Sequence, residues 1–275
     1  MWIFNSIFGK VFEFIFIPFR NLSPWVGMTL ISLLTGLLML LIFRYTSNQE
    51  GIRKVKNKIK AHLLELRLFK DSLALSLKAQ GNILRSNIRY IGYSGKPMLV
   101  MIIPLILILI QLNFWFAYQS LRPGEVTILK VKLQEDQNIL DLDLKVEFPP
   151  SLAIETPPLR IEEQQEINWR LRAREKGLHS LTFKINGQSF TKKVAVAQKP
   201  LTRISPLKVK RNFIDELFNP AEVPLSKGLP VKSIEVEYPA KNMNLFGWHI
   251  HWIIVYFALS IIFGFALKGV FKVEI

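Results

Sequence analysis

WVGMTLISLLTGLLMLLIF, residues 25–43, is one of two apolar stretches that organise this chain; the other is PMLVMIIPLILILIQLNFWFAY, residues 97–118. Each is close to the roughly 20 residues that a helix needs to cross about 30 Å of hydrocarbon. The segment between them, residues 44–96, contains twelve Lys or Arg but only three Asp or Glu. The pattern predicts two transmembrane helices joined by a basic loop.

The chain as a whole is apolar and basic. Half of its 275 residues are hydrophobic and its net charge is +15. A basic chain can bind nucleic acid, but the excess charge lies between two spans. That placement favours the positive-inside rule, and DNA is not an expected partner. There is no cysteine, which excludes disulfides, thiol catalysis and cysteine metal sites.

The first twenty residues alternate between aromatic and polar side chains with a helical period. Asn5, Ser6, Gly9, Lys10 and Glu13 fall on one helical face, and aromatic or aliphatic residues fill the rest. This pattern is typical of a helix that lies in the membrane interface, and a Pro at position 18 ends it. A short, irregular first span is the alternative interpretation.

The first span carries a stripe of hydroxyl side chains, Thr29, Ser32 and Thr35, at intervals of three residues. Such a stripe indicates either close packing against another helix or one wall of a polar groove. Arg44 lies at the end of this span, where it either reaches the head groups or contributes to the groove.

The basic loop has a helical apolar pattern in two parts. Apolar residues recur every three or four positions from Ile52 to Phe69, and again at Leu73, Leu77, Leu84 and Ile88. We therefore predict two helices, broken at residues 69–72, that pair as an antiparallel coiled coil with an apolar seam and basic outer faces. Gly and Pro residues between 92 and 97 predict a joint before the second span.

The second span contains Pro104, Gln111 and Asn113. The proline predicts a kink. Amide side chains are costly when they face lipid, so Gln111 and Asn113 are expected to face protein or water.

The pattern changes to period two after residue 125. Alternating segments separated by turn residues predict strands at 126–133, 140–148, 166–175, 179–185, 190–197 and 231–238, and a short helix is expected at 212–218. Trp169 is a candidate core residue. This region is therefore predicted to be an all-β, immunoglobulin-like sandwich.

The last apolar stretch, residues 245–269, is predicted to be a third span. Ser260 and Gly264 form a small-xxx-small pair that allows another helix to approach. His249 and His251 lie on nearly opposite sides of a helix, which favours interfacial histidines over metal ligands.

Together these segments predict a multi-pass protein of the cytoplasmic (inner) membrane, with the N-terminus outside and the C-terminus inside. Its expected parts are an interfacial amphipathic helix (1–22), span one (23–46), a basic cytoplasmic helical hairpin (47–95), span two (96–119), an extracytoplasmic β-sandwich (120–242), and span three with a short cytoplasmic tail (243–275).

The arrangement resembles the YidC/Oxa/Get insertase superfamily, and is most similar to three-span archaeal YidC-like proteins and the insertase subunit of the ER membrane protein complex. The resemblance rests on FRYTSNQEGIRKVKNKIK (43–60), LKAQGNIL (77–84) and GKPMLVMIIPLILIL (95–109), together with the layout of residues 1–119 and the last span. The β region between the second and third spans is not part of the minimal family pattern.

The resemblance implies a membrane protein insertase or chaperone, in which a polar groove between the spans admits hydrophobic client segments. The implied partners are client membrane proteins, the lipid bilayer, and the ribosome or other membrane subunits. The expected groove residues are Thr29, Ser32, Thr35, Arg44, Gln111, Asn113 and Ser260. The expected client-recruiting residues on the hairpin are Arg53, Lys56, Lys60, Arg85 and Arg89.

Two alternative functions were weighed. The first is a scaffold or binding protein that acts through its outer β domain, whose ligand is unknown, with the spans as an anchor. The second is an enzyme, which is not expected, because the four histidines are scattered and Asp141 and Asp143 fit a solvated strand face. No cofactor or metal is expected.

Overall fold

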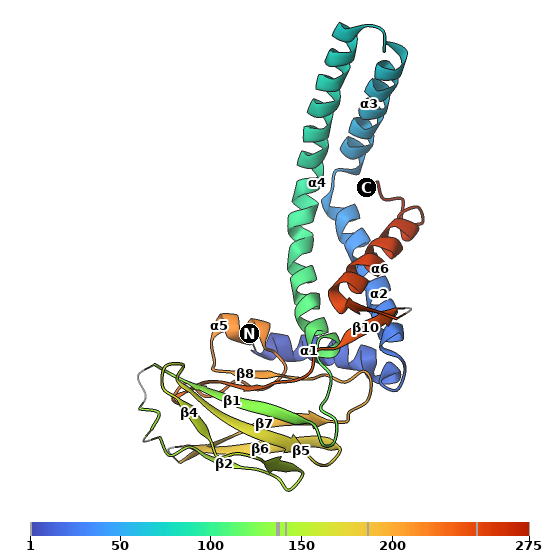
Figure 1. Ribbon diagram of the computed structural model, residues 1–275. Helices are drawn as coiled ribbons and strands as arrows, with labels where there is room; N and C mark the ends of the chain where they lie inside the picture. The colour runs from blue at the N-terminus through green and yellow to red at the C-terminus, as the bar shows by residue number, and fades with distance from the viewer. Residues whose placement is uncertain (1, 136–137, 141, 186, 246, 275) are drawn as a thin grey trace. The chain divides into compact units, whose positions relative to one another are not determined.

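The computed structural model describes residues 2–135, 138–140, 142–185, 187–245 and 247–274, with the side chains of residues 2–6 left out (Figure 1). The chain divides into two compact units. Unit 1 comprises residues 1–27 and 109–252, and unit 2 comprises residues 28–108 and 253–275. Each unit is described by itself below.

Two helices are long and apolar enough to span a membrane. They are α2 (Pro24–Thr46) and α4 (Leu73–Phe116). The Ser23 hydroxyl accepts a hydrogen bond from the Trp25 N–H at 3.4 Å, as a residue preceding a helix with Pro at its first position should. The helix α2 thus covers nearly the same residues as the stretch 23–46 that was predicted as span one.

The helix α4 is continuous over 44 residues and contains both Pro97 and Pro104. The predicted joint at residues 92–97 is therefore wrong. Gly costs about 1 kcal/mol and Pro about 3 kcal/mol in a helix interior, but long helical segments on both sides offset such local costs. In hydrocarbon a broken helix would also leave backbone groups without partners.

The hairpin of unit 2 consists of α3 (Gln49–Leu68) and the first part of α4, which run antiparallel in Figure 1. The predicted break at residues 69–72 is confirmed. The N-cap of α3 is Asn48, whose side chain accepts a hydrogen bond from the Gly51 N–H at 2.9 Å.

The seam of this hairpin differs from the prediction on both helices. Ile52 and Val55 of α3 are buried, as expected, but Leu63 and Phe69, which the same pattern placed in the seam, are exposed. On α4 the shielded side chains are instead Ala79, which is buried, and Ser76, Asn82, Ile83, Ser86 and Asn87, which are half-buried. The small ones among them allow two helices to approach closely. The predicted seam residues Leu73, Leu77, Leu84 and Ile88 are all exposed, with relative accessibilities of 79%, 59%, 64% and 64%.

The third apolar helix, α6 (Trp252–Leu267), has 16 residues and is shorter than predicted. The residues before it form a two-stranded antiparallel sheet of β10 (Asn242–Leu245) and β11 (Trp248–His251). Gly247 has a φ of +90° in the turn, and its N–H donates to Asn244 Oδ1 at 2.9 Å. His249 and His251 therefore lie on a strand, where residues two apart share a face. Within the described ranges no group of three or more potential metal-ligating side chains occurs.

Unit 1 contains α1 (Trp2–Phe16), followed by a 3-10 turn at Ile17–Phe19 that includes the predicted terminating proline. Phe16 packs against Trp115 and Phe116 at the end of α4, with ring centroids 4.7 and 5.8 Å apart. Lys10 and Glu13 are exposed, as predicted for the polar face.

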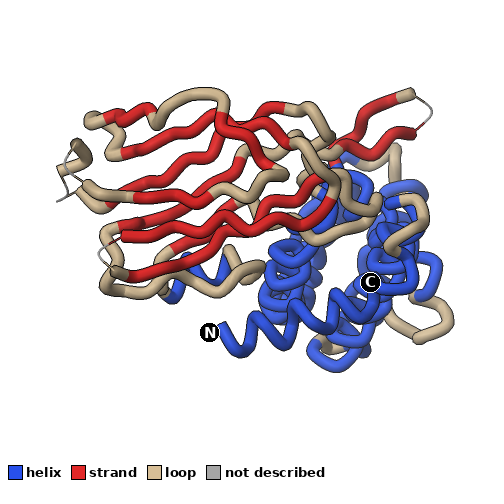
Figure 2. Tube along the Cα trace, turned by 90° about the horizontal axis from the view of Figure 1, so that it is seen from below, coloured by secondary structure: helices blue, strands red, loops and turns tan. Residues whose placement is uncertain are grey.

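The β region of unit 1 has two sheets that share one core. The pairing order of the larger sheet is β3-β5-β1-β9-β8, with β4 also paired to β5, and the order of the smaller sheet is β2-β6-β7 (Figure 2). The strands are β1 (Val126–Leu133), β2 (Lys145–Glu147), β3 (Leu152–Ile154), β4 (Leu159–Ile161), β5 (Glu166–Ala173), β6 (Gly177–Ile185), β7 (Gln188–Val196), β8 (Leu207–Val209) and β9 (Val231–Val236), with the helix α5 (Phe213–Phe218) after β8.

The core of the β region follows the alternation in the sequence. Every second residue of β1 is buried, and Trp169 of β5 lies in the core with inward residues of both sheets, which confirms its predicted place. Phe183 and Phe190 are stacked as a cross-strand pair on β6 and β7, with centroids 5.3 Å apart. Five of the six predicted strands are found with bounds close to those expected. Of the predicted strand at 140–148, the described residues form only β2.

A buried ion pair fixes the segment after β7. Lys192 on β7 is fully buried; its Nζ donates to Ser205 O at 2.7 Å and to the Glu222 carboxylate. Burial lowers the pKa of Lys192, and the negative charge of Glu222 opposes this effect. The pair thus attaches residues 205–222 to the smaller sheet.

We expect Glu222→Gln to destabilise unit 1 by about 3 kcal/mol, because it leaves the Lys192 charge buried without its counter-ion. Thermal unfolding of the full chain in detergent, followed by tryptophan fluorescence, measures the change. The exposed pair Lys184–Glu147 provides the control, since Glu147→Gln should cost less than about 1 kcal/mol. Equal losses in the two variants would contradict this account of the buried pair.

Candidate functional site

A cavity of about 520 Å³ lies within unit 2, between α2, α4 and α6. Its wall is almost entirely apolar, and Gly36 of α2 marks the closest approach to α6. A Cβ at that position would lie 3.0 Å from Ser260 O. The lining residues are Thr35, Gly36, Met39, Leu40, Phe43, Tyr90, Ile91, Ser94, Met98, Met101, Ile102, Leu105, Tyr256, Phe257, Ser260, Ile261, Gly264 and Phe265.

Four hydroxyl groups on this wall are buried. They belong to Thr35, Ser94, Tyr256 and Ser260. The Tyr256 hydroxyl lies within hydrogen-bonding reach of the Thr35 and Ser260 hydroxyls, so three of the four form a polar cluster. Burying a hydroxyl in apolar surroundings is costly, so four in one cavity form an unusually polar set for an apolar wall.

The structure brings together only part of the predicted groove. Thr35 and Ser260 line the cavity. Ser32 is buried beside it; its hydroxyl donates to Tyr256 O at 3.4 Å and so links α2 to α6. Thr29 and Arg44 are exposed and do not belong to the cavity wall. Among the described residues, those that line the cavity include no charged side chain.

Gln111 and Asn113 were also predicted in the groove, but neither lines this cavity. Gln111 belongs to unit 1, where its side chain is buried and its Oε1 accepts a hydrogen bond from Arg203 Nη2 at 3.2 Å. Asn113 is half-buried. The prediction that these amides face protein rather than lipid is correct for Gln111, but its partner is an arginine more than ninety residues away in the sequence.

The end of α4 in unit 1 is contacted by two half-buried cations. Arg203 lies over the ring of Phe114, and Lys241 lies over the ring of Phe116. Lys241 Nζ donates to Trp115 O at 3.3 Å and to Pro200 O at 2.6 Å, and burial lowers its pKa to about 8. A cation is favourable at a helix C-terminus, where carbonyl groups lack intrahelical partners. These cations therefore have a structural role at the end of the helix.

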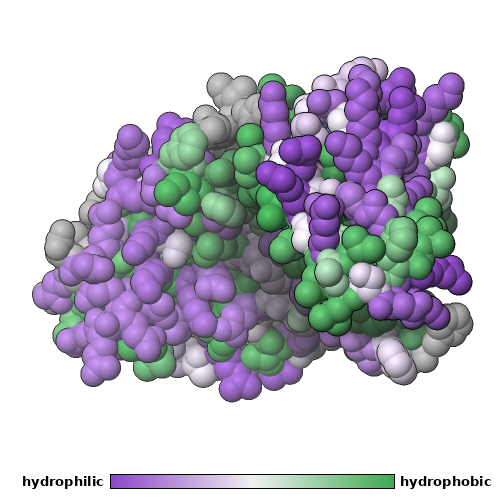
Figure 3. Space-filling view, turned by 90° about the horizontal axis from the view of Figure 1, so that it is seen from above, coloured by the Kyte–Doolittle hydropathy of each residue, from purple (hydrophilic) through white to green (hydrophobic). Residues whose placement is uncertain are grey.

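The predicted recruiting residues of the hairpin are mostly free surface charges. Arg53, Lys60, Arg85 and Arg89 are exposed. Lys56 instead forms an ion pair with Glu274, with Nζ and Oε2 3.0 Å apart. Viewed onto the hairpin end, the surface shows apolar side chains directly beside hydrophilic ones (Figure 3). The apolar residues exposed on the hairpin are Leu63, Leu64, Leu68, Phe69, Leu73, Leu75, Leu77, Leu84, Ile88 and Ile91.

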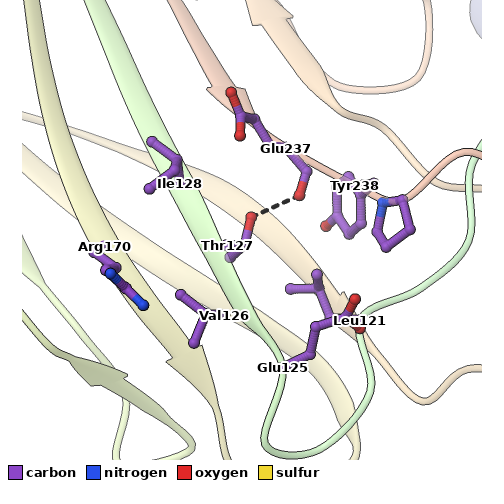
Figure 4. Close-up of a pocket in the computed structure, with 9 residues that line it drawn as sticks. Leu121, Glu125, Val126, Thr127, Ile128, Arg170, Glu237 and Tyr238 are labelled. Carbon is purple, nitrogen blue, oxygen red and sulfur yellow. Dashed lines mark hydrogen bonds between the residues drawn. The ribbon is translucent and has the colours of Figure 1, made fainter.

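A second cavity, of about 330 Å³, lies on the β region of unit 1 beside β1 (Figure 4). Its polar groups already have partners. The Thr127 hydroxyl donates to Glu237 O at 2.6 Å, Arg170 pairs with Glu155, and the Glu125 carboxylate accepts from the Arg122 N–H. The groups of this cavity therefore stabilise the sheet edge and do not present free donors or acceptors to a ligand.

Comparisons with protein-family models, with curated proteins and with solved structures gave no match to this chain. The function is therefore argued from the geometry of the chain alone.

Sequence reasoning missed Ser94 and Tyr256. Ser94 lies in the segment that was predicted to be a joint before span two, and Tyr256 lies within the predicted third span, where it was not singled out as a groove residue. A signal was available for both: Ser260 lies one turn after Tyr256, and Tyr90 and Ser94 are also four residues apart, so each pair shares a helical face.

We expect Gln111→Leu to destabilise unit 1 by about 1–3 kcal/mol, because the half-buried Arg203 loses the acceptor that the buried Gln111 provides. The midpoint of chemical unfolding in detergent measures the effect. Asn113→Leu is the matched control, and its effect should be smaller because its side chain is only half-buried. A midpoint for Gln111→Leu equal to that of the wild type would show that the contact with Arg203 contributes nothing.

Proposed function

We propose that the chain is a membrane protein insertase or chaperone of the YidC/Oxa type, and that the cavity of unit 2 receives hydrophobic segments of client membrane proteins. The observation that carries this proposal is the set of four buried hydroxyl groups on an otherwise apolar wall. Polar groups are costly to bury in apolar surroundings, so their presence favours a role in binding.

The chemistry of the wall suits a segment that is mostly apolar but has a polar flank. Apolar side chains such as Met39 and Met101 accommodate varied shapes, because methionine is flexible and polarisable. The hydroxyls of Thr35 and Tyr256 hydrogen-bond water or polar atoms of the passing segment. Each such bond offsets part of the several kcal/mol that an unpaired polar group costs in hydrocarbon.

The size of the cavity supports partial enclosure of the client. A spanning helix about 10 Å wide and 30 Å long occupies roughly 2,400 Å³, which is several times the cavity volume of about 520 Å³. The client therefore lies with one face in the cavity and the other toward lipid.

The hairpin supplies the recruitment surface in this proposal. Exposed apolar patches larger than a few hundred Å² commonly mark interaction sites. Leu77, Leu84 and Ile88 lie on one face of α4 and are flanked by the basic residues Arg85 and Arg89. We assign this face to the first contact with a hydrophobic client, and the charges to solubility and orientation at the membrane surface.

Membrane topology belongs to the same proposal. The basic hairpin is cytoplasmic, the β region is extracytoplasmic, and α6 forms a third, short span, with the N-terminus outside. The β region is assigned to the immunoglobulin-like sandwiches. The orders β9-β1-β5-β3 and β2-β6-β7 correspond to the A-B-E-D and C-F-G sheets of that fold, with β9 in the place of the first strand.

We expect the double substitution Thr35→Val and Tyr256→Phe to reduce insertion of a short-tailed client several-fold while leaving the thermal midpoint of the protein near or above that of the wild type. Both changes keep the shape of the wall and remove two neighbouring hydroxyls together, so the folded state loses little stability and the cavity loses two of its four hydroxyl groups. Insertion into proteoliposomes and thermal unfolding measure the two effects.

Ser32→Ala is the control for this experiment. It removes a hydroxyl that is hydrogen-bonded and lies outside the cavity, so it should lower the midpoint slightly and leave insertion intact. Full insertion by the double variant would refute a role for the hydroxyls in client binding.

We expect replacement of Leu77, Leu84 and Ile88 by Ser to reduce photo-crosslinking of a client to the hairpin, with little change in stability because all three side chains are exposed. Ile83→Ser is the control; this side chain is half-buried, so the change should lower stability and leave crosslinking close to wild type. Undiminished crosslinking in the triple variant would exclude this face as the recruitment surface.

A further inference from the structure

The chain turns back on itself after α6, within unit 2. The Val273 N–H donates to Lys268 O at 3.0 Å and the Lys272 N–H donates to Gly269 O at 3.2 Å. These two bonds are the pair that defines a Schellman motif at a helix end. Lys272 occupies the left-handed position of the motif, with a φ of +51°, where glycine is usually found.

The reversal places residues 273 and 274 on the base of α3. Val273 is 6% exposed and is buried in a cluster with Leu40, Phe43 and Ile52. The Glu274 N–H donates to Gln49 Oε1 at 2.7 Å, and the Glu274 carboxylate pairs with Lys56. Side-chain and backbone contacts thus hold this segment in one position.

The same cluster forms part of the cavity wall. Leu40 and Phe43 line the cavity, as do Tyr90 and Met101, which pack against the cluster from α4. Val273 and Phe271 therefore support the wall from behind, at the end of the cavity next to the hairpin. Removing them would leave these side chains without packing on one side.

We propose that residues 268–274 form a releasable latch that closes the hairpin end of the cavity, and that the base of α3 is its docking surface. The role of the latch rests on the proposed function, since release would open a path for a client from the hairpin into the cavity. The docking of residues 268–274 on α3 does not depend on that function.

Two features make the latch releasable. The ion pair between Lys56 and Glu274 is partly exposed, with side-chain accessibilities of 32% and 42%, and such pairs contribute little to stability. The left-handed conformation of Lys272 is unfavourable for a residue with a Cβ, so the docked turn is strained. Only one apolar side chain of the segment, Val273, is buried, so little apolar surface has to be exposed on release.

The first experiment measures access to the cavity without any client. Ser94→Cys introduces a single thiol into a chain that has none, at a buried position on the cavity wall. Its rate of reaction with N-ethylmaleimide is measured in proteoliposomes, alone and combined with Glu274→Lys. Charge reversal at position 274 puts a second ammonium group beside Lys56 and near Arg53 and Lys60, so we expect the rate to rise about threefold or more.

The charge-swap variant, Lys56→Glu with Glu274→Lys, is the matched control for the reversal. It restores an ion pair at the same place, so the labelling rate should return toward that of Ser94→Cys alone. An unchanged rate in the reversed variant, or no recovery in the swap, would overturn the latch.

The second experiment tests whether release matters for activity. Lys56→Cys with Glu274→Cys is joined by a short bis-methanethiosulfonate reagent, and a reductant later removes the link. We expect insertion to be lost in the linked protein and restored on reduction. Lys54→Cys with Glu274→Cys is the control, because residue 54 lies about 200° around the axis of α3 from residue 56, so a thiol there should link poorly to position 274.

The two proposals fail in different ways. Full insertion by the linked protein would overturn the latch and leave the insertase proposal intact. Absence of insertion in the unmodified protein would overturn the insertase proposal, while the labelling rates would still decide whether the segment closes the cavity.

Discussion

The continuity of α4 is the constraint on which the rest of the structure depends. One uninterrupted helix of 44 residues supplies an arm of the hairpin, a wall of the cavity and, at its last turns, the aromatic rings on which Arg203 and Lys241 rest. A joint at residues 92–97 would have allowed Leu84 and Ile88 to rotate around the helix axis independently of Ser94 and Met101. Because the helix is unbroken, the positions of these four side chains around its axis are fixed relative to one another.

The cavity combines two properties that rarely occur together. Its wall is apolar enough to suit hydrocarbon, yet it carries four buried hydroxyl groups. Gly36 allows α2 and α6 to come into close contact. In the proposed function, a polar surface without fixed charge would stabilise water and client amides while avoiding the much larger cost of a buried ion.

The sequence predicted those features that local patterns determine. Apolar length identified α2 and the second half of α4, the break at residues 69–72 separated the hairpin helices, and period-two alternation located β1, β5, β6, β7 and β9. Features that depend on contacts between distant residues could not be predicted from the sequence. The helix α4 carries both a leucine stripe and a stripe of small residues, and only the approach of α3 determines which stripe is shielded. Residues 248–251 continue an apolar run, so the strand β11 was assigned to a helix. The partner of Gln111 lies far along the chain, and no local signal points to Arg203.

The position of β1 has a consequence for biogenesis. This strand lies between β5 and β9, and β9 begins about a hundred residues after β1. While the polypeptide is being made, one edge of β1 must wait unpaired until residue 236 has emerged, and closing so long a loop is slow. An unpaired edge invites pairing with other chains. The region therefore completes its larger sheet only after nearly all of it has been synthesised, just before α6 emerges.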